Sequence, residues 1–191
     1  MVRHVGSEKE ENLLFTQIGE LVVRWNACED AMRLLLYRLS GGGNRIEAIV
    51  WSLPNIQLSD SIRAISFDID DAKTAYHLRH AEQLFTLLRS YRNYLVHGPI
   101  SLASSHGKPI AFVQEVTSKG GKLTLHQKIV RETDVQSVVA QLYDLQDYLS
   151  QLIGALYGVP NAPDLSSLEK PPLPEGLKRN RTNLIELRRQ E

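Results

Sequence analysis

The chain has 191 residues, enough for one substantial core, and its 42% hydrophobic and 23% charged residues are ordinary for a globular protein. Its formal net charge is zero, which excludes a global basic field as the drive for nucleic-acid or membrane binding. The single cysteine, Cys28, excludes an intrachain disulfide and a cysteine-based zinc site. With no signal-peptide pattern and no run near the ~18 apolar residues of a membrane span, we expect a cytoplasmic protein without membrane contacts.

A long amphipathic helix is predicted first, ending at the glycine triplet 41–43. Its apolar residues recur at steps of three and four, the spacing of a helix packed on other helices. They are Leu14, Ile18, Leu21, Trp25, Cys28, Met32, Leu35 and Leu39. We expect Trp25 to lie in the core. Glu29 is expected to pair either with Arg33, four residues further along the helix, or with an arginine of a functional site.

Two short helices and a second long helix are predicted next. The first short helix covers about residues 44–51, and the second begins at Ser59 or Asp60 as its N-cap. Asp70 and Asp71 are expected to cap the long helix. It should end at His97, because the Gly-Pro pair at 98–99 cannot continue it.

The apolar period changes to two between residues 109 and 130, around a glycine turn at 118–121. This pattern predicts a β-hairpin inserted between helices. An isolated hairpin is only marginally stable, so we expect it to lie on the bundle or on a partner. A last long helix should follow, with Thr133 and Gln136 forming its N-terminal cap, and it should stop at Gly158.

The tail, residues 160–191, differs from the rest of the chain because it contains five prolines. It is expected to be an arm that wraps a neighbour or stays mobile. The sequence therefore predicts a mostly α, up-and-down helical bundle over residues 1–159, with an inserted hairpin over about 109–130 and a proline-rich C-terminal arm over 160–191.

Arg92, Asn93 and His97 stand just before the predicted end of the second long helix. On a helix, Asn93 and His97 lie only ~40° apart, one turn from each other. Arg92 continues the apolar series of this helix and so occupies a position that should face the core. A guanidinium there must be paired or must line a polar cavity. The three residues therefore indicate a functional site.

Cleavage of RNA without a metal needs a base for the 2′-hydroxyl, an acid for the leaving oxygen and a cation for the phosphorane. Histidine can serve in either proton role, and arginine can hold phosphate oxygens bidentately. A single His97 cannot easily be base and acid at once. Two copies facing each other across a dimer axis would divide the two roles.

The segment Arg92-Asn93-Tyr94-Leu95-Val96-His97 resembles the signature of the HEPN superfamily, an Arg followed by a polar residue and, four to six residues after the Arg, a His. The all-α layout over roughly residues 8–158 is similar as well. The resemblance implies a homodimer whose motifs meet at the interface and, in active members, metal-independent RNA cleavage that leaves cyclic phosphate ends. Carried over, Arg92 and His97 would be catalytic and Asn93 the supporting polar residue.

The leading hypothesis is a HEPN-like endoribonuclease that uses no cofactor or metal, in a toxin–antitoxin or phage-defence setting with an antitoxin as partner. One alternative is a non-catalytic HEPN module that binds a nucleotide or a protein. Another is a structural dimer in which the motif only holds the interface, or a polar helix end with Arg92 in a salt bridge. His77 and His80, three residues apart, are spaced for metal binding, but we expect a solvated face.

Overall fold

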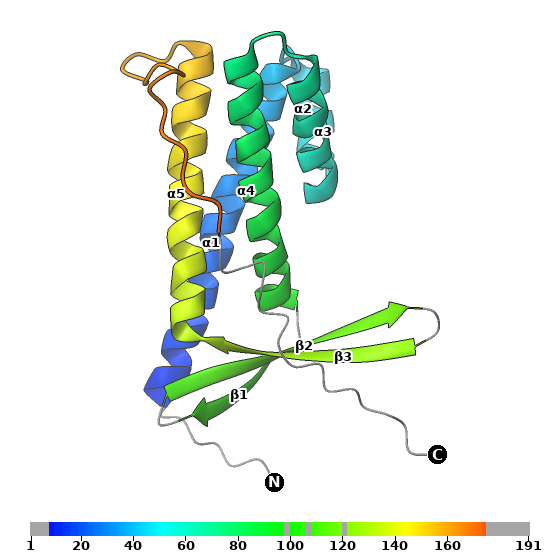
Figure 1. Ribbon diagram of the computed structural model, residues 1–191, viewed down its shortest axis with the longest axis vertical. Coiled ribbons are helices and arrows are strands. Elements are labelled where there is room, and N and C mark those ends of the chain that lie inside the picture. The colour runs from blue at the N-terminus through cyan, green and yellow to red at the C-terminus, as the bar shows by residue number, and fades with distance from the viewer. Residues whose placement is uncertain (1–7, 98–99, 106–107, 120–121, 175–191) are drawn as a thin grey trace. The chain divides into compact units, whose positions relative to one another are not determined.

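A computed structural model of the chain describes residues 8–97, 100–105, 108–119 and 122–174, and most of these residues are helical (Figure 1). The chain divides into two compact units. In the described residues, one unit comprises the chain up to Val22 together with Ser90–Val139, and the other comprises Val23–Arg89 and Ala140–Pro174. The proline-rich segment after residue 159 thus belongs, as far as Pro174, to the second unit.

Five helices and three strands make up the described chain (Figure 1). The helices are α1 (Glu8–Leu39), α2 (Asn44–Ser52), α3 (Asn55–Asp68), α4 (Ala72–His97) and α5 (Glu132–Tyr157). The strands are β1 (Ile100–Ser105), β2 (Lys108–Lys119) and β3 (Lys122–Arg131). The three long helices each contribute one part to each compact unit.

The core of the second unit is formed by apolar side chains of α1, α3, α4 and α5. Trp25 is fully buried and stacks on Phe85, with 4.5 Å between the ring centroids, which confirms its predicted place in the core. Cys28 is also buried, its thiol lies 3.3 Å from the carbonyl oxygen of Leu142, and burial raises the pKa of the thiol to about 12. The predicted pair of Glu29 and Arg33 is confirmed at 2.5 Å. Helical periodicity alone was sufficient to identify these faces.

Helix starts were predicted with mixed success. Asp71 caps α4 as expected, because its carboxylate accepts the backbone N–H of Thr74 at 3.0 Å and the hydroxyl of Thr74, and these bonds lower the pKa of Asp71. The predicted cap of α3 at Ser59 or Asp60 is wrong. The helix begins at Asn55 after Pro54, whose φ of −63° suits a helix entry and whose carbonyl accepts the N–H of Leu58 at 3.0 Å.

The start of α5 also differs from the prediction. Thr133 lies inside the helix, which begins at Glu132. The carboxylate of Asp134 instead accepts the backbone N–H of Arg131 at 2.8 Å. A charged acceptor at the third helical position satisfies the N–H just before the helix, as the reciprocal half of a capping box does.

The sheet of the first unit is antiparallel, in the order β1-β2-β3. Strands β2 and β3 occupy the place of the expected hairpin, with Lys119 paired to Lys122 beside the turn and Ile110 paired to Arg131 at the far end. Strand β1, which pairs Ile100 with Val113, was not predicted, because its Ser- and Ala-rich sequence shows little apolar alternation.

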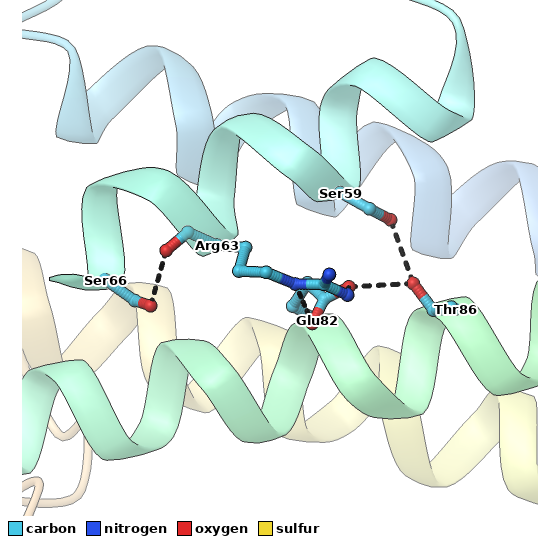
Figure 2. A network of polar contacts seen from close by, with 5 residues as sticks. All are labelled: Ser59, Arg63, Ser66, Glu82 and Thr86. Atoms are coloured by element: carbon cyan, nitrogen blue, oxygen red, sulfur yellow. Dashed lines mark hydrogen bonds and ion pairs between the residues drawn. The ribbon is translucent and has the colours of Figure 1, made fainter.

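A buried carboxylate connects α3 to α4 (Figure 2). Glu82 is 2% exposed and receives two hydrogen bonds from Arg63, at 2.6 and 3.2 Å, which raise the pKa of the guanidinium. The hydroxyl of Thr86 donates to the same carboxylate at 2.9 Å. It also lies 3.2 Å from the hydroxyl of Ser59. Because a buried charge is tolerated only when it is paired, this network specifies how α3 lies on α4.

Gly154 of α5 lies where the chain after the helix turns back onto it. A Cβ at this position would be 2.9 Å from the Cβ of Ala162. We expect Gly154→Ala to destabilise the fold by about 1–3 kcal/mol through overpacking, which exceeds the gain of roughly 1 kcal/mol in helix propensity. Thermal unfolding should show the loss, and Ala162→Gly in the same chain should reverse it. Gly19→Ala, at a helical site with nothing within 4 Å, is the matched control and should not destabilise.

Candidate functional site

The three motif residues meet at the C-terminal end of α4, in the first compact unit. Nη1 of Arg92 donates a hydrogen bond to Oδ1 of Asn93 at 3.1 Å and lies 2.5 Å from Nε2 of His97. One guanidinium nitrogen thus contacts both other members of the motif. The structure brings all three predicted site residues together.

The contact between Arg92 and His97 determines where the imidazole carries its proton. A guanidinium has only donors and stays protonated in proteins. Nε2 of His97 must therefore accept this hydrogen bond, and the proton of the neutral ring lies on Nδ1. In this tautomer Nε2 is unprotonated, and its lone pair can later take a proton from a substrate hydroxyl.

The exposure of these side chains differs from what the apolar series predicts. Asn93 and His97 are exposed, and Arg92 is half-buried instead of lying in the core. The guanidinium of Arg92 lies along its own helix, and its Nε is buried without a hydrogen-bond partner among the described residues. The position accommodates a charged group because the helix end offers Asn93 and His97 as local partners.

Residues on the same helical turns fix the end of α4. Leu95 is buried, and the hydroxyl of Tyr94 donates to the carbonyl oxygen of Val113 in β2 at 3.2 Å. Tyr91 is half-buried, and burial, with a further contribution from Asp134, raises its pKa to about 12. The motif therefore sits on a helix end that a hydrogen bond to strand β2 holds in place.

His77 and His80 correct the prediction of a solvated face. His77 is 5% exposed, with Nδ1 2.8 Å from the hydroxyl of Tyr148 and Nε2 3.0 Å from the carbonyl oxygen of Leu165. Nε2 of His80 lies 2.8 Å from the carbonyl oxygen of Pro171. Both imidazoles bind the backbone of the proline-rich segment. Burial lowers the pKa of each ring.

A sequence signal for the burial of His77 existed. This residue belongs to a second series on α4 with steps of three and four, whose members are all buried: Thr74, His77, Ala81, Leu84 and Leu88. The apolar series that Arg92 continues passes instead through Leu78 and Phe85. A buried imidazole needs a hydrogen-bond partner for each ring nitrogen. The partner of Nε2 is the carbonyl oxygen of Leu165, 88 residues further along the chain.

The expected C-terminal arm over residues 160–191 is described as far as Pro174. Leu168 and Pro174 are buried in the second unit, so this part of the tail packs on its own chain. Residues 175–191 lie outside the described residues.

Two further features concern function classes. Across the described ranges, no helix is both long and apolar enough to cross a membrane. In the same ranges, no three His, Cys, Asp or Glu side chains gather as metal ligands would. A comparison with protein-family models found no match, and comparisons with curated proteins and with solved structures found none either. The functional conclusion therefore depends on the residues themselves.

Proposed function

We propose that this protein is a metal-independent endoribonuclease of the HEPN type that acts as a homodimer. The observation that carries the proposal is the contact of one Arg92 nitrogen with both Asn93 and His97 at an exposed helix end. In this proposal, residues 1–159 form a HEPN-like up-and-down bundle with the hairpin as an insertion. Residues 160–191 form its proline-rich arm. The resemblance of residues 92–97 to the HEPN signature supports the same assignment.

In the proposed reaction, an RNA phosphate competes with His97 for the guanidinium of Arg92. The edge formed by Nε and Nη2 suits two phosphate oxygens, and because Nε is shielded in the free protein, the side chain must turn outward to present it. That movement breaks the contact with His97 and frees Nε2. Asn93 remains one turn away to orient the imidazole or to bind a phosphate oxygen.

The proton transfers then balance between two copies of the chain. Nε2 of one His97 takes the proton of the ribose 2′-hydroxyl, and the 2′-oxygen attacks the phosphorus atom. Arg92 stabilises the charge of the phosphorane. His97 of a second copy, in its protonated form, donates a proton to the departing 5′-oxygen. The products are a 2′,3′-cyclic phosphate and a 5′-hydroxyl. The proposed setting, toxin–antitoxin or phage defence with an antitoxin partner, rests on the resemblance alone.

The test is cleavage of a mixed pool of structured and single-stranded RNA in EDTA, with analysis of the product ends. We expect the wild type to leave cyclic phosphate ends. His97→Ala should lower the rate by about 10²–10⁴-fold, the usual contribution of a general acid or base. Both proteins should have the same oligomeric state by sedimentation.

Equal cleavage by wild type and His97→Ala would assign the activity to another site or to a contaminant. If neither protein cleaves any RNA in the pool, saturable binding of a nucleotide that requires Arg92 would instead support the non-catalytic HEPN module.

A further inference from the structure

Residues 162–174, which we call the strap, return along α5 after the turn at Gly158–Asn161 (Figure 1). Within the second unit the strap is held by the side chain of Leu168, which is 7% exposed, and by hydrogen bonds to two backbone carbonyl oxygens of the strap. The carbonyl oxygens of Leu165 and Pro171 lie 3.0 and 2.8 Å from Nε2 of His77 and His80. Two histidines of one helix thus bind the strap at points six residues apart.

The hydrogen bonds require each Nε2 to carry a proton, because a carbonyl oxygen only accepts. The Nδ1 of His77 then accepts the hydroxyl of Tyr148, at 2.8 Å, while the ring is neutral. A proton added at this Nδ1 would make it a donor. The hydroxyl of Tyr148 would then have to reverse and donate to the backbone oxygen of His77, a longer contact of 3.3 Å.

The hydrogen bonds to the carbonyl oxygens of Leu165 and Pro171 favour the protonated rings, but burial outweighs them and lowers both pKa values. The charges around the two imidazoles also disfavour protonation. Lys170 of the strap lies with its Nζ 3.2 Å from the ring centroid of Tyr76, and its charge acts on both histidines. The other charge that acts on His80 is His77 itself, and no carboxylate in the described part of the chain is among these influences. The acidic groups of the strap are directed elsewhere, since Asp164 accepts the N–H of Ser166 at 2.9 Å and Glu169 is exposed.

We propose that the strap is an acid-released latch, held on α4 by neutral His77 and His80 and freed when these rings are protonated beside Lys170. Release would uncover the buried side chains of Leu168 and Pro174. This inference does not depend on the proposed ribonuclease activity, because no residue of the motif takes part in it.

The direction of the pH dependence follows from proton linkage. A released histidine has a pKa of about 6.5, and burial lowers the pKa of both rings in the latched state. The released state therefore binds more protons below about pH 6.5, and the latch is weakened as the pH falls from there toward the latched pKa values. Each histidine can shift the ratio of latched to released chains by up to about tenfold per pH unit in this window.

The test is the mobility of a nitroxide spin label at Ser167→Cys, an exposed strap position, between pH 8 and pH 5. Cys28 is buried with a pKa of about 12, so the label reacts at the new cysteine. We expect an immobilised spectrum at pH 8 and a growing mobile component below about pH 6.5. A label at Glu47→Cys, an exposed position of α2, should show no change, which separates strap release from global unfolding.

Two variants decide the cause. His77→Gln with His80→Gln keeps an N–H donor at each ring position but removes the titration, so the spectrum should no longer depend on pH. Lys170→Met keeps both imidazoles and removes the like charge, so release should require a lower pH. A pH-independent wild-type spectrum, an unchanged transition in the double variant, or an unmoved midpoint in Lys170→Met would each overturn the proposal.

Discussion

If the protein is the proposed ribonuclease, replacement of Arg92 by alanine is expected to lower RNA cleavage by about 10²–10³-fold, the usual effect of removing one preorganised donor to a developing charge. The loss should be larger than that of a simple surface arginine for two reasons. Arg92 would hold the phosphate, and in the free protein its Nη1 also orders Asn93 and His97. Single-turnover rates on one defined RNA would measure the effect on the chemical step.

The matched control is Arg45→Ala, an exposed arginine of α2 whose loss should leave cleavage unchanged. Arg92→Lys should recover only part of the rate, because an ammonium group cannot hold two phosphate oxygens in the planar geometry of a guanidinium. If Arg92→Ala cleaves as fast as the wild type but melts at a lower temperature or dissociates, the motif holds an interface and the catalytic assignment is wrong.

Replacement of Trp25 by alanine is expected to lower the free energy of unfolding by about 3–5 kcal/mol. The side chain is fully buried and stacks on Phe85 at a centroid distance of 4.5 Å. Its indole N–H also donates to the carboxylate of Glu29 at 2.9 Å, so the variant loses both a packing contact and a hydrogen bond to a charged group. Urea denaturation followed by circular dichroism would measure the change.

Two substitutions separate the contributions. Trp25→Phe keeps most of the buried ring and loses the N–H, so it should cost less than Trp25→Ala. Trp51→Ala removes the other tryptophan, which is 49% exposed, and should have the smaller effect expected for a partly solvated side chain. Equal losses for Trp25→Ala and Trp51→Ala would show that the stack with Phe85 contributes little to stability.

Most of the motif geometry was predictable because it is local. The 3.6-residue period of a helix places Asn93 and His97 one turn apart in any helical context, and a long arginine can reach both. The burial of Arg92 was less predictable. The apolar series of α4 places this residue in the core, whereas the structure leaves it half-buried. Its Nη1 contacts the side chains of Asn93 and His97 on the same helix.

The sequence by itself determined the long helices, the buried stripe of α1 that contains Trp25, and the cap at Asp71. These features depend on local periodicity and local hydrogen bonds, which are readable within a few residues. Only the tertiary structure decided the partners of polar groups from distant segments. The carboxylate of Glu82 is paired by Arg63, and His77 binds the carbonyl of Leu165. Such pairs are set by how helices and strap pack, and no short-range pattern in the sequence specifies that packing.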